Sequence, residues 1–148
     1  MTDVKICGLT RPADVALACE LGARYLGFNF SAASPRRISP AAARGLVASA
    51  PRHVSRVGVF VDETAAEMRE AADAADLDFI QIHRVLRPDD IDLSPRPVFA
   101  VARVGTTLGA PPDETLARCR AVLFDAAASG RAGGTGATFD WDLLAGRR

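Results

Sequence analysis

The sequence is poor in the residues that build disulfide frameworks and metal sites. Of its 148 residues, three are Cys, two are His and one is Lys. Cys7, Cys19 and Cys119 are widely spaced and contain no Cys-x-x-Cys pair, so we expect neither disulfides nor a zinc site. His53 and His83 are too far apart along the chain for a compact metal motif. This usage is typical of a reducing compartment, and we expect a cytoplasmic protein.

An excess of charge and long apolar runs are also missing. Lys and Arg together number 18, as do Asp and Glu, so the chain lacks the basic patch that nucleic-acid binding needs. No apolar run approaches the roughly 18–20 residues of a membrane span, and residues 1–8 are typical of a strand rather than a signal peptide. With 49% hydrophobic and 24% charged residues, residues 1–148 are interpreted as one globular domain with neither a nucleic-acid nor a membrane partner.

Short β-rich segments alternate with Ala-rich helical segments along the whole chain. Strands are predicted over 4–7, 25–30, 54–61, 79–83, 98–104 and 121–125, and helices over 12–21, 41–50, 65–76, 112–120 and 139–145. Thr10 and Ser39 are predicted helix N-caps, and Thr64 with Glu67 has capping-box spacing. The fourth unit is short, and only one helical turn is expected near 88–91.

Six βα units in series imply an α/β fold with a parallel sheet covered by helices. Right-handed crossovers leave two architectures, a doubly wound open sheet or a βα-barrel, and periodicity does not choose between them. In both, chemistry belongs at the carboxyl ends of the strands. The positions at those ends are Cys7, the loop after Phe30, Val61 and Asp62, His83, Arg103 and Asp125.

Two of these residues could transfer protons. Cys7 ends the first strand and could act as a thiolate base, or it could be a small buried hydrophobic residue, which the residues alone favour. Asp125 ends the sixth strand and could act as a general acid, or it could cap a helix or order a loop. The residues alone leave both readings of Asp125 open.

Three further features could bind a ligand. Arg36, in the loop after the second strand, could clamp a carboxylate or phosphate, or be a solvated surface residue. Gln81 and His83 alternate on one strand and so share a face, which favours a ligand contact and a hydrogen-bonded core pair equally. Gly133, Gly134, Thr135 and Gly136 could cradle an anion at a helix N-terminus, although a flexible turn explains this pattern better.

Taken in chain order, these segments resemble phosphoribosylanthranilate isomerase, the βα-barrel (TIM-barrel) enzyme of tryptophan biosynthesis. The matching segments are 4–10, 27–28, 34–40, 57–61, 81–83, Asp125, 133–136 and 138–141. The resemblance implies an Amadori rearrangement of N-(5-phosphoribosyl)anthranilate to 1-(2-carboxyphenylamino)-1-deoxyribulose 5-phosphate. It also implies a small phosphosugar substrate and no metal or organic cofactor.

The resemblance also implies roles for individual residues. Asp125 matches the general acid that protonates the ribose ring oxygen, and Cys7 matches the general base that removes the C2 proton. Arg36 matches the arginine that faces the anthranilate carboxylate. Gln81 and His83 are predicted to bind substrate, and Gly133, Gly134, Thr135 and Gly136 are predicted to bind its phosphate in part.

Two departures from the family shape the remaining expectations. Arg84 stands where the family usually has glycine, and the chain ends where the family continues with two more βα units. About six of eight units are therefore expected, in a sheet that stays unclosed. The chain is expected to be poorly stable or to associate through its open edges, and to isomerise weakly or not at all. The alternatives are a non-catalytic or complementation fragment of such an enzyme, and an open-sheet module that binds a phosphosugar or nucleotide.

Overall fold

The computed structural model describes residues 2–48, 50–87, 89–126 and 138–145. The strands are β1 (Lys5–Cys7), β2 (Tyr25–Asn29), β3 (Ser55–Phe60), β4 (Phe79–Ile82), β5 (Val98–Val104), β6 (Leu108–Gly109) and β7 (Ala121–Ala126). The helices are α1 (Pro12–Glu20), α2 (Pro40–Val47), α3 (Ala65–Ala74), α4 (Asp89–Leu93) and α5 (Asp113–Leu116), followed by the 3₁₀ helix η1 (Trp141–Leu144).

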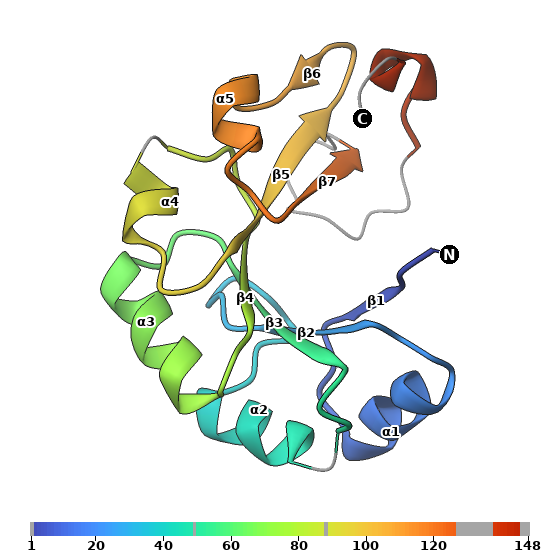
Figure 1. The fold of residues 1–148 in the computed structure, drawn as a ribbon, viewed down its shortest axis with the longest axis vertical. Helices are drawn as coiled ribbons and strands as arrows, with labels where there is room; N and C mark the ends of the chain where they lie inside the picture. Colours follow the sequence, from blue (N-terminus) through green and yellow to red (C-terminus); the bar gives the residue numbers. More distant parts are fainter. Residues whose placement is uncertain (1, 49, 88, 127–137, 146–148) are drawn as a thin grey trace.

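The order of the strands decides between the two predicted architectures. Strands β1 to β5 lie side by side in chain order, β7 pairs with β5, and each of these pairings is parallel. The sheet curls, and helices α1 to α4 lie outside the curve, along the bottom and left of Figure 1. A doubly wound sheet would reverse its strand order, whereas a βα-barrel keeps it. The described residues therefore form part of a barrel, as the βα-barrel prediction requires.

Local sequence signals place several helix ends. Ser39 accepts a hydrogen bond from the Ala42 N–H ahead of α2, and Thr64 forms the predicted capping box with Glu67. The Thr10 prediction is wrong, because α1 has Arg11 at its N-cap and no side-chain capping bond. Helix α1 tolerates the lack of a side-chain cap because Pro12 follows Arg11. The missing N–H and the fixed φ of proline already suit the first helical turn.

The segment between β5 and β7 differs most from the prediction. The expected helix over 112–120 is reduced to α5, so Cys119, which was expected within it, lies beyond its end. The chain also forms β6, which pairs antiparallel with the end of β5 through Arg103↔Gly109 and Val104↔Leu108. This strand has two residues, too short for a period-two pattern to reveal it.

The outer face of the sheet packs against the helices in one buried cluster. Leu26, Phe28, Phe60, Ile80 and Ile82 from the strands are almost fully buried there, together with apolar residues of α1, α2 and α3. These strand residues are even-numbered, so the odd-numbered neighbours point to the concave face. The alternation therefore decides which side chains can reach the candidate site.

The concave face carries a smaller aromatic cluster. Tyr25, Phe79 and Phe99 form it with Val57, and the ring centroids of Phe79 and Phe99 lie 5.1 Å apart. Tyr25 meets both phenylalanines edge-on, a favourable geometry for aromatic pairs. This cluster supports the polar residues that follow on the same face of β4, β5 and β7.

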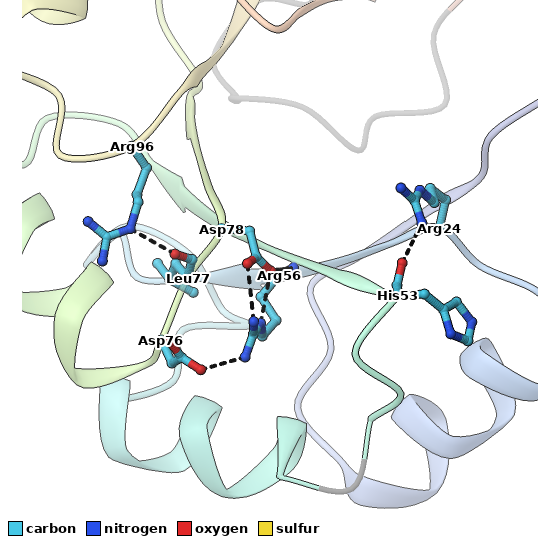
Figure 2. A network of polar contacts seen from close by, with 7 residues as sticks. All are labelled: Arg24, His53, Arg56, Asp76, Leu77, Asp78 and Arg96. Atoms are coloured by element: carbon cyan, nitrogen blue, oxygen red, sulfur yellow. Dashed lines mark hydrogen bonds and ion pairs between the residues drawn. The ribbon is translucent and has the colours of Figure 1, made fainter.

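The amino ends of the strands are joined by a network of arginines (Figure 2). Arg56 on β3 forms ion pairs with Asp78 and Asp76, at 2.9 Å and 2.6 Å. Arg24 donates to the His53 carbonyl, and Arg96 donates to the Leu77 carbonyl. These bonds connect the segments that precede β2, β3, β4 and β5. They lie at the end of the sheet opposite the candidate site and stabilise the barrel there.

Replacing Arg56 by alanine is expected to lower the free energy of unfolding by about 2 kcal/mol. The variant removes a half-buried guanidinium and leaves the Asp78 carboxylate with only the backbone N–H of residue 56 as its partner on β3. Urea unfolding followed by circular dichroism measures the difference. The matched control is Arg52→Ala, which truncates an exposed arginine and is expected to change stability by less than about 0.5 kcal/mol. Equal effects of the two substitutions would contradict the prediction.

Within the described residues, β1 and β7 are the outer strands of the parallel part of the sheet, each paired with a single neighbour. Unpaired strand edges can recruit other strands, so self-association through β1 and β7 stays a prediction.

Among the helices of the described residues, none combines the length and the apolar composition that a membrane span requires.

Candidate active site

The structure places the predicted proton-transfer residues on strands at the two edges of the described sheet. Cys7 is the last residue of β1 and is exposed, and Asp125 lies near the end of β7, with 24% of its side chain exposed. His83 directly follows β4, where its backbone N–H donates to the Phe60 carbonyl. All three positions are at the carboxyl ends of their strands, as predicted.

His83 and Asp125 come together across the intervening strand β5. His83 Nε2 lies 3.3 Å from Asp125 Oδ2, and the side chains are 15% and 24% exposed. Both atoms are themselves buried and have no hydrogen-bond partner among the described residues. The two atoms are therefore in close contact without forming a hydrogen bond.

Gln81 extends this contact into the core. Gln81 is 3% exposed, and its Nε2 lies 3.1 Å from His83 Nδ1. The two residues share the concave face of β4, two positions apart, as predicted. Gln81, His83 and Asp125 therefore form one continuous row of polar groups from the middle of the sheet to its β7 edge.

The electrostatic environment of His83 favours the neutral imidazole. Burial lowers the pKa of His83 below its ordinary value, the Asp125 carboxylate opposes that shift, and the positive charges of Arg103 and Lys5 reinforce it. Arg103 lies directly beside Asp125 in the β5–β7 register. A neutral His83 retains one N–H donor and one lone pair, and which nitrogen carries the proton depends on its hydrogen-bond partners.

A glycine makes room for Cys7 and Lys5 on the concave face. A Cβ atom added to Gly27 would lie 2.8 Å from Lys5 Nζ and 3.0 Å from Cys7 Sγ. The ammonium and the thiol therefore both lie over the backbone of β2, which pairs with β1 at this level. Cys7 is exposed, so its thiol is accessible at this end of the sheet.

Arg36 reaches the same end of β1 from the loop after β2. Its Nη1 donates to the Cys7 carbonyl oxygen at 2.9 Å, and the rest of the side chain is exposed. Gly8 has φ +79°, and a Cβ atom there would lie 2.5 Å from Arg36 Nη1. Gly8 is thus needed both for its left-handed backbone and for the close approach of the guanidinium. Arg36 is held beside Cys7 while its remaining N–H groups stay available to an anion.

Two further sequence predictions concern a phosphate-binding loop and a metal site. The candidate phosphate-binding residues Gly133, Gly134, Thr135 and Gly136 lie outside the described residues. No cluster of three or more His, Cys, Asp or Glu side chains with metal-binding geometry occurs in the described part of the chain.

The structure also adds two residues to the site. Lys5 was not singled out as a site residue from the sequence, although its spacing from Cys7 puts both on one face of β1. Arg103 was placed at a strand end without a role, and the β5–β7 register brings it beside Asp125. Period-two alternation was the signal that could have identified Lys5.

Known proteins of one family resemble this chain over most of its length. The family model of N-(5'-phosphoribosyl)anthranilate isomerase matches residues 4–148. The chain belongs to this family. The enzyme of that name from Pseudomonas fluorescens is 38% identical over 146 residues, which cover 95% of this chain and 67% of that protein. A relative from Pelobacter propionicus is 39% identical, with 99% of this chain and 69% of that protein covered.

Solved structures of phosphoribosylanthranilate isomerases have the same fold. The enzyme from Thermus thermophilus superposes with a TM-score of 0.83 at 32% identity, over 97% of this chain and 70% of that one. The Thermotoga maritima enzyme gives a TM-score of 0.77 at 31% identity, over the same shares. A phosphoribosylanthranilate isomerase in complex with reduced 1-(o-carboxyphenylamino)-1-deoxyribulose 5-phosphate gives 0.72 at 29% identity, over 97% of this chain and 69% of that one. The chain thus spans about two thirds of the length of these isomerases.

Proposed function

We propose that this chain carries the isomerisation of N-(5-phosphoribosyl)anthranilate to 1-(2-carboxyphenylamino)-1-deoxyribulose 5-phosphate in tryptophan biosynthesis. The observation that carries the proposal is the placement of Cys7, Arg36, His83 and Asp125 at one end of the sheet, in a chain that belongs to the isomerase family. The related isomerase solved with the reduced product analogue supports a phosphosugar ligand. Three free cysteines support a cytoplasmic location.

The reaction begins with ring opening, in which Asp125 acts as general acid. The Asp125 carboxyl proton passes to the ribose ring oxygen and the bond from C1 to that oxygen breaks. The lone pair of the anthranilate nitrogen forms the C1=N bond, which gives a protonated Schiff base and an open sugar chain. Asp125 is left as a carboxylate, and its charge is close to His83 and Arg103.

The second step is removal of the C2 proton by the Cys7 thiolate. The electrons of the C2–H bond form C1=C2, and those of the C1=N bond return to nitrogen as its lone pair, which gives an enolamine. The enol oxygen then loses its proton and C1 gains one, so the product ketone has the same composition as the substrate. The Asp125 carboxyl and the Cys7 thiolate supply the proton transfers of ring opening and of C2 deprotonation. Proton exchange with solvent supplies those of the tautomerisation and returns both groups to their starting forms.

Arg36 is proposed to bind the anthranilate carboxylate. An arginine can hold a carboxylate with two parallel hydrogen bonds, and one of the Arg36 nitrogens is already fixed on the Cys7 carbonyl. The bound carboxylate would then place the sugar carbons close to the thiol. Gln81 and His83 stay predicted substrate-binding residues, with His83 the one nearer the open end of the site.

Replacing Arg36 by lysine is expected to raise KM roughly 10–100-fold, with a smaller loss in kcat. Lysine keeps the charge but loses the planar pair of donors. The assay generates the substrate in place and follows the loss of its anthranilate-type fluorescence. The matched control is Arg37→Lys, since Arg37 instead donates to the Phe30 carbonyl. An unchanged KM for Arg36→Lys would contradict the role of Arg36, and absence of turnover by the unaltered chain would contradict the proposed function.

A further inference from the structure

Gln81, His83 and Asp125 are joined by two consecutive polar contacts. Its members come from β4, from the residue after β4, and from β7, and their contacts are 3.1 Å and 3.3 Å long. Asp125 is the member of the row to which the proposed mechanism gives a proton transfer. The function of His83 can therefore be deduced from its two neighbours.

The amide of Gln81 determines where the imidazole proton lies. An amide nitrogen is a donor only, so Gln81 Nε2 donates its hydrogen to His83 Nδ1. Nδ1 must then be the unprotonated nitrogen, and a neutral ring carries its proton on Nε2. Burial and the nearby charges of Arg103 and Lys5 lower the pKa of His83, which supports the neutral ring.

The protonated nitrogen points at Asp125. His83 Nε2 and Asp125 Oδ2 face each other at 3.3 Å, and neither has another partner in the described part of the chain. A small rotation of the ring would satisfy both buried atoms with one N–H···O bond. Such a bond would fix the rotation of the carboxyl group and leave Oδ1 as the oxygen presented to the substrate.

We propose that His83 is a positioning residue for Asp125. It donates from Nε2 to Oδ2, and Gln81 holds it in the Nε2–H tautomer. The proposal rests on the proposed function for its consequence, since it deepens the role of Asp125 as general acid. It also changes the role of the two residues that were predicted to bind substrate. Gln81 affects the reaction through His83, and His83 affects it through Asp125.

The first test observes the tautomer directly and needs no turnover. The chain is labelled with ¹⁵N-histidine, and long-range proton–nitrogen spectra at pH 7.5 report which ring nitrogen carries the proton. The chain has two histidines, so the spectrum of His53→Gln assigns the His83 signals. The expected result is a neutral His83 in the Nε2–H form, with the ¹⁵N signal of the unprotonated Nδ1 shifted in Gln81→Leu because its hydrogen bond from the amide is lost. A charged ring, an Nδ1–H ring, or an Nδ1 signal unaffected by Gln81→Leu would overturn the proposal.

The second test separates positioning from substrate contact. His83→Met is expected to lower kcat roughly 10–100-fold while KM changes less than about 2-fold, because a hydrogen bond to a charged group is lost without loss of a substrate contact. His83→Gln can place an amide donor near the position of Nε2 and is expected to recover most of kcat. A rise in KM at constant kcat, or no recovery with glutamine, would overturn the proposal.

The two tests keep this proposal distinct from the proposed function. If the unaltered chain shows no turnover, the proposed function fails, and the nitrogen spectra still decide whether the row exists. If the chain is active and the spectra show the Nδ1–H form, the proposal for His83 fails alone. Should His83→Met fail to fold, Gln81→Leu serves as the kinetic variant, with a loss of kcat of roughly 3–10-fold expected at unchanged KM.

Discussion

Asp125→Asn is expected to lower kcat roughly 10²–10⁴-fold, the range that general acid catalysis contributes. Asparagine has nearly the same size and can still accept from His83 Nε2, but it has no carboxyl proton to give to the ring oxygen. Ring opening would then depend on solvent. Because the amide keeps the shape of the site, KM is expected to stay within about 3-fold of its original value. Steady-state kinetics of fluorescence loss measure both constants.

The control for this variant is Asp89→Asn. Asp89 is an exposed residue at the start of α4, so the same chemical change there should leave kcat and KM within about 2-fold. Urea unfolding of both variants separates loss of chemistry from loss of structure. A kcat for Asp125→Asn close to that of Asp89→Asn would remove Asp125 from the reaction.

The prediction of Asp125 as a site residue succeeded because strand ends can be found from local pattern. The expected strand over 98–104 matches β5, and the strand over 121–125 differs from β7 by one residue. Short runs of β-branched and aromatic residues bounded by polar segments are sufficient for this purpose. The capping residues Ser39 and Thr64 also allowed the starts of α2 and α3 to be predicted.

The partners of Asp125 could not be predicted in the same way. The contact between His83 and Asp125 depends on β5 lying between β4 and β7, and periodicity permits another strand order. The shared face of Gln81 and His83 was visible, yet their order along a row toward Asp125 was not. Loss of helix after 116 and the short strand β6 had no pattern long enough to detect. Pairings between distant segments follow from the whole sheet, not from local residues.

Cys7→Ala is expected to lower kcat roughly 10²–10⁴-fold by removing the base that takes the C2 proton. The substitution leaves the backbone carbonyl that binds Arg36 in place, so substrate binding should change little. The expected signature is therefore a fall in kcat at nearly constant KM. A nucleotide-binding module would instead be indifferent to this substitution, so the variant also separates the proposed function from that alternative.

Chemical modification tests Cys7 against the other two cysteines of the same chain. Burial raises the pKa of Cys19 and of Cys119, whereas Cys7 is exposed, and only a thiolate reacts quickly with iodoacetamide. At pH 7.5 the first label should enter Cys7, and activity should fall in proportion to that label, as read by mass spectrometry of peptides. Substrate should slow both processes, since it covers the thiol.

Cys19→Ala is the matched control, because it removes a thiol from α1 on the outer side of the sheet. This variant should keep its activity and should lose that activity to iodoacetamide at the same rate as the unaltered chain. Labelling of Cys7 without loss of activity would show that the thiol is exposed but unused. Loss of activity that follows a label on Cys19 or Cys119 would show damage to the core rather than to the base. Only inactivation that tracks Cys7, and disappears in Cys7→Ala together with kcat, fits a thiolate that removes the C2 proton.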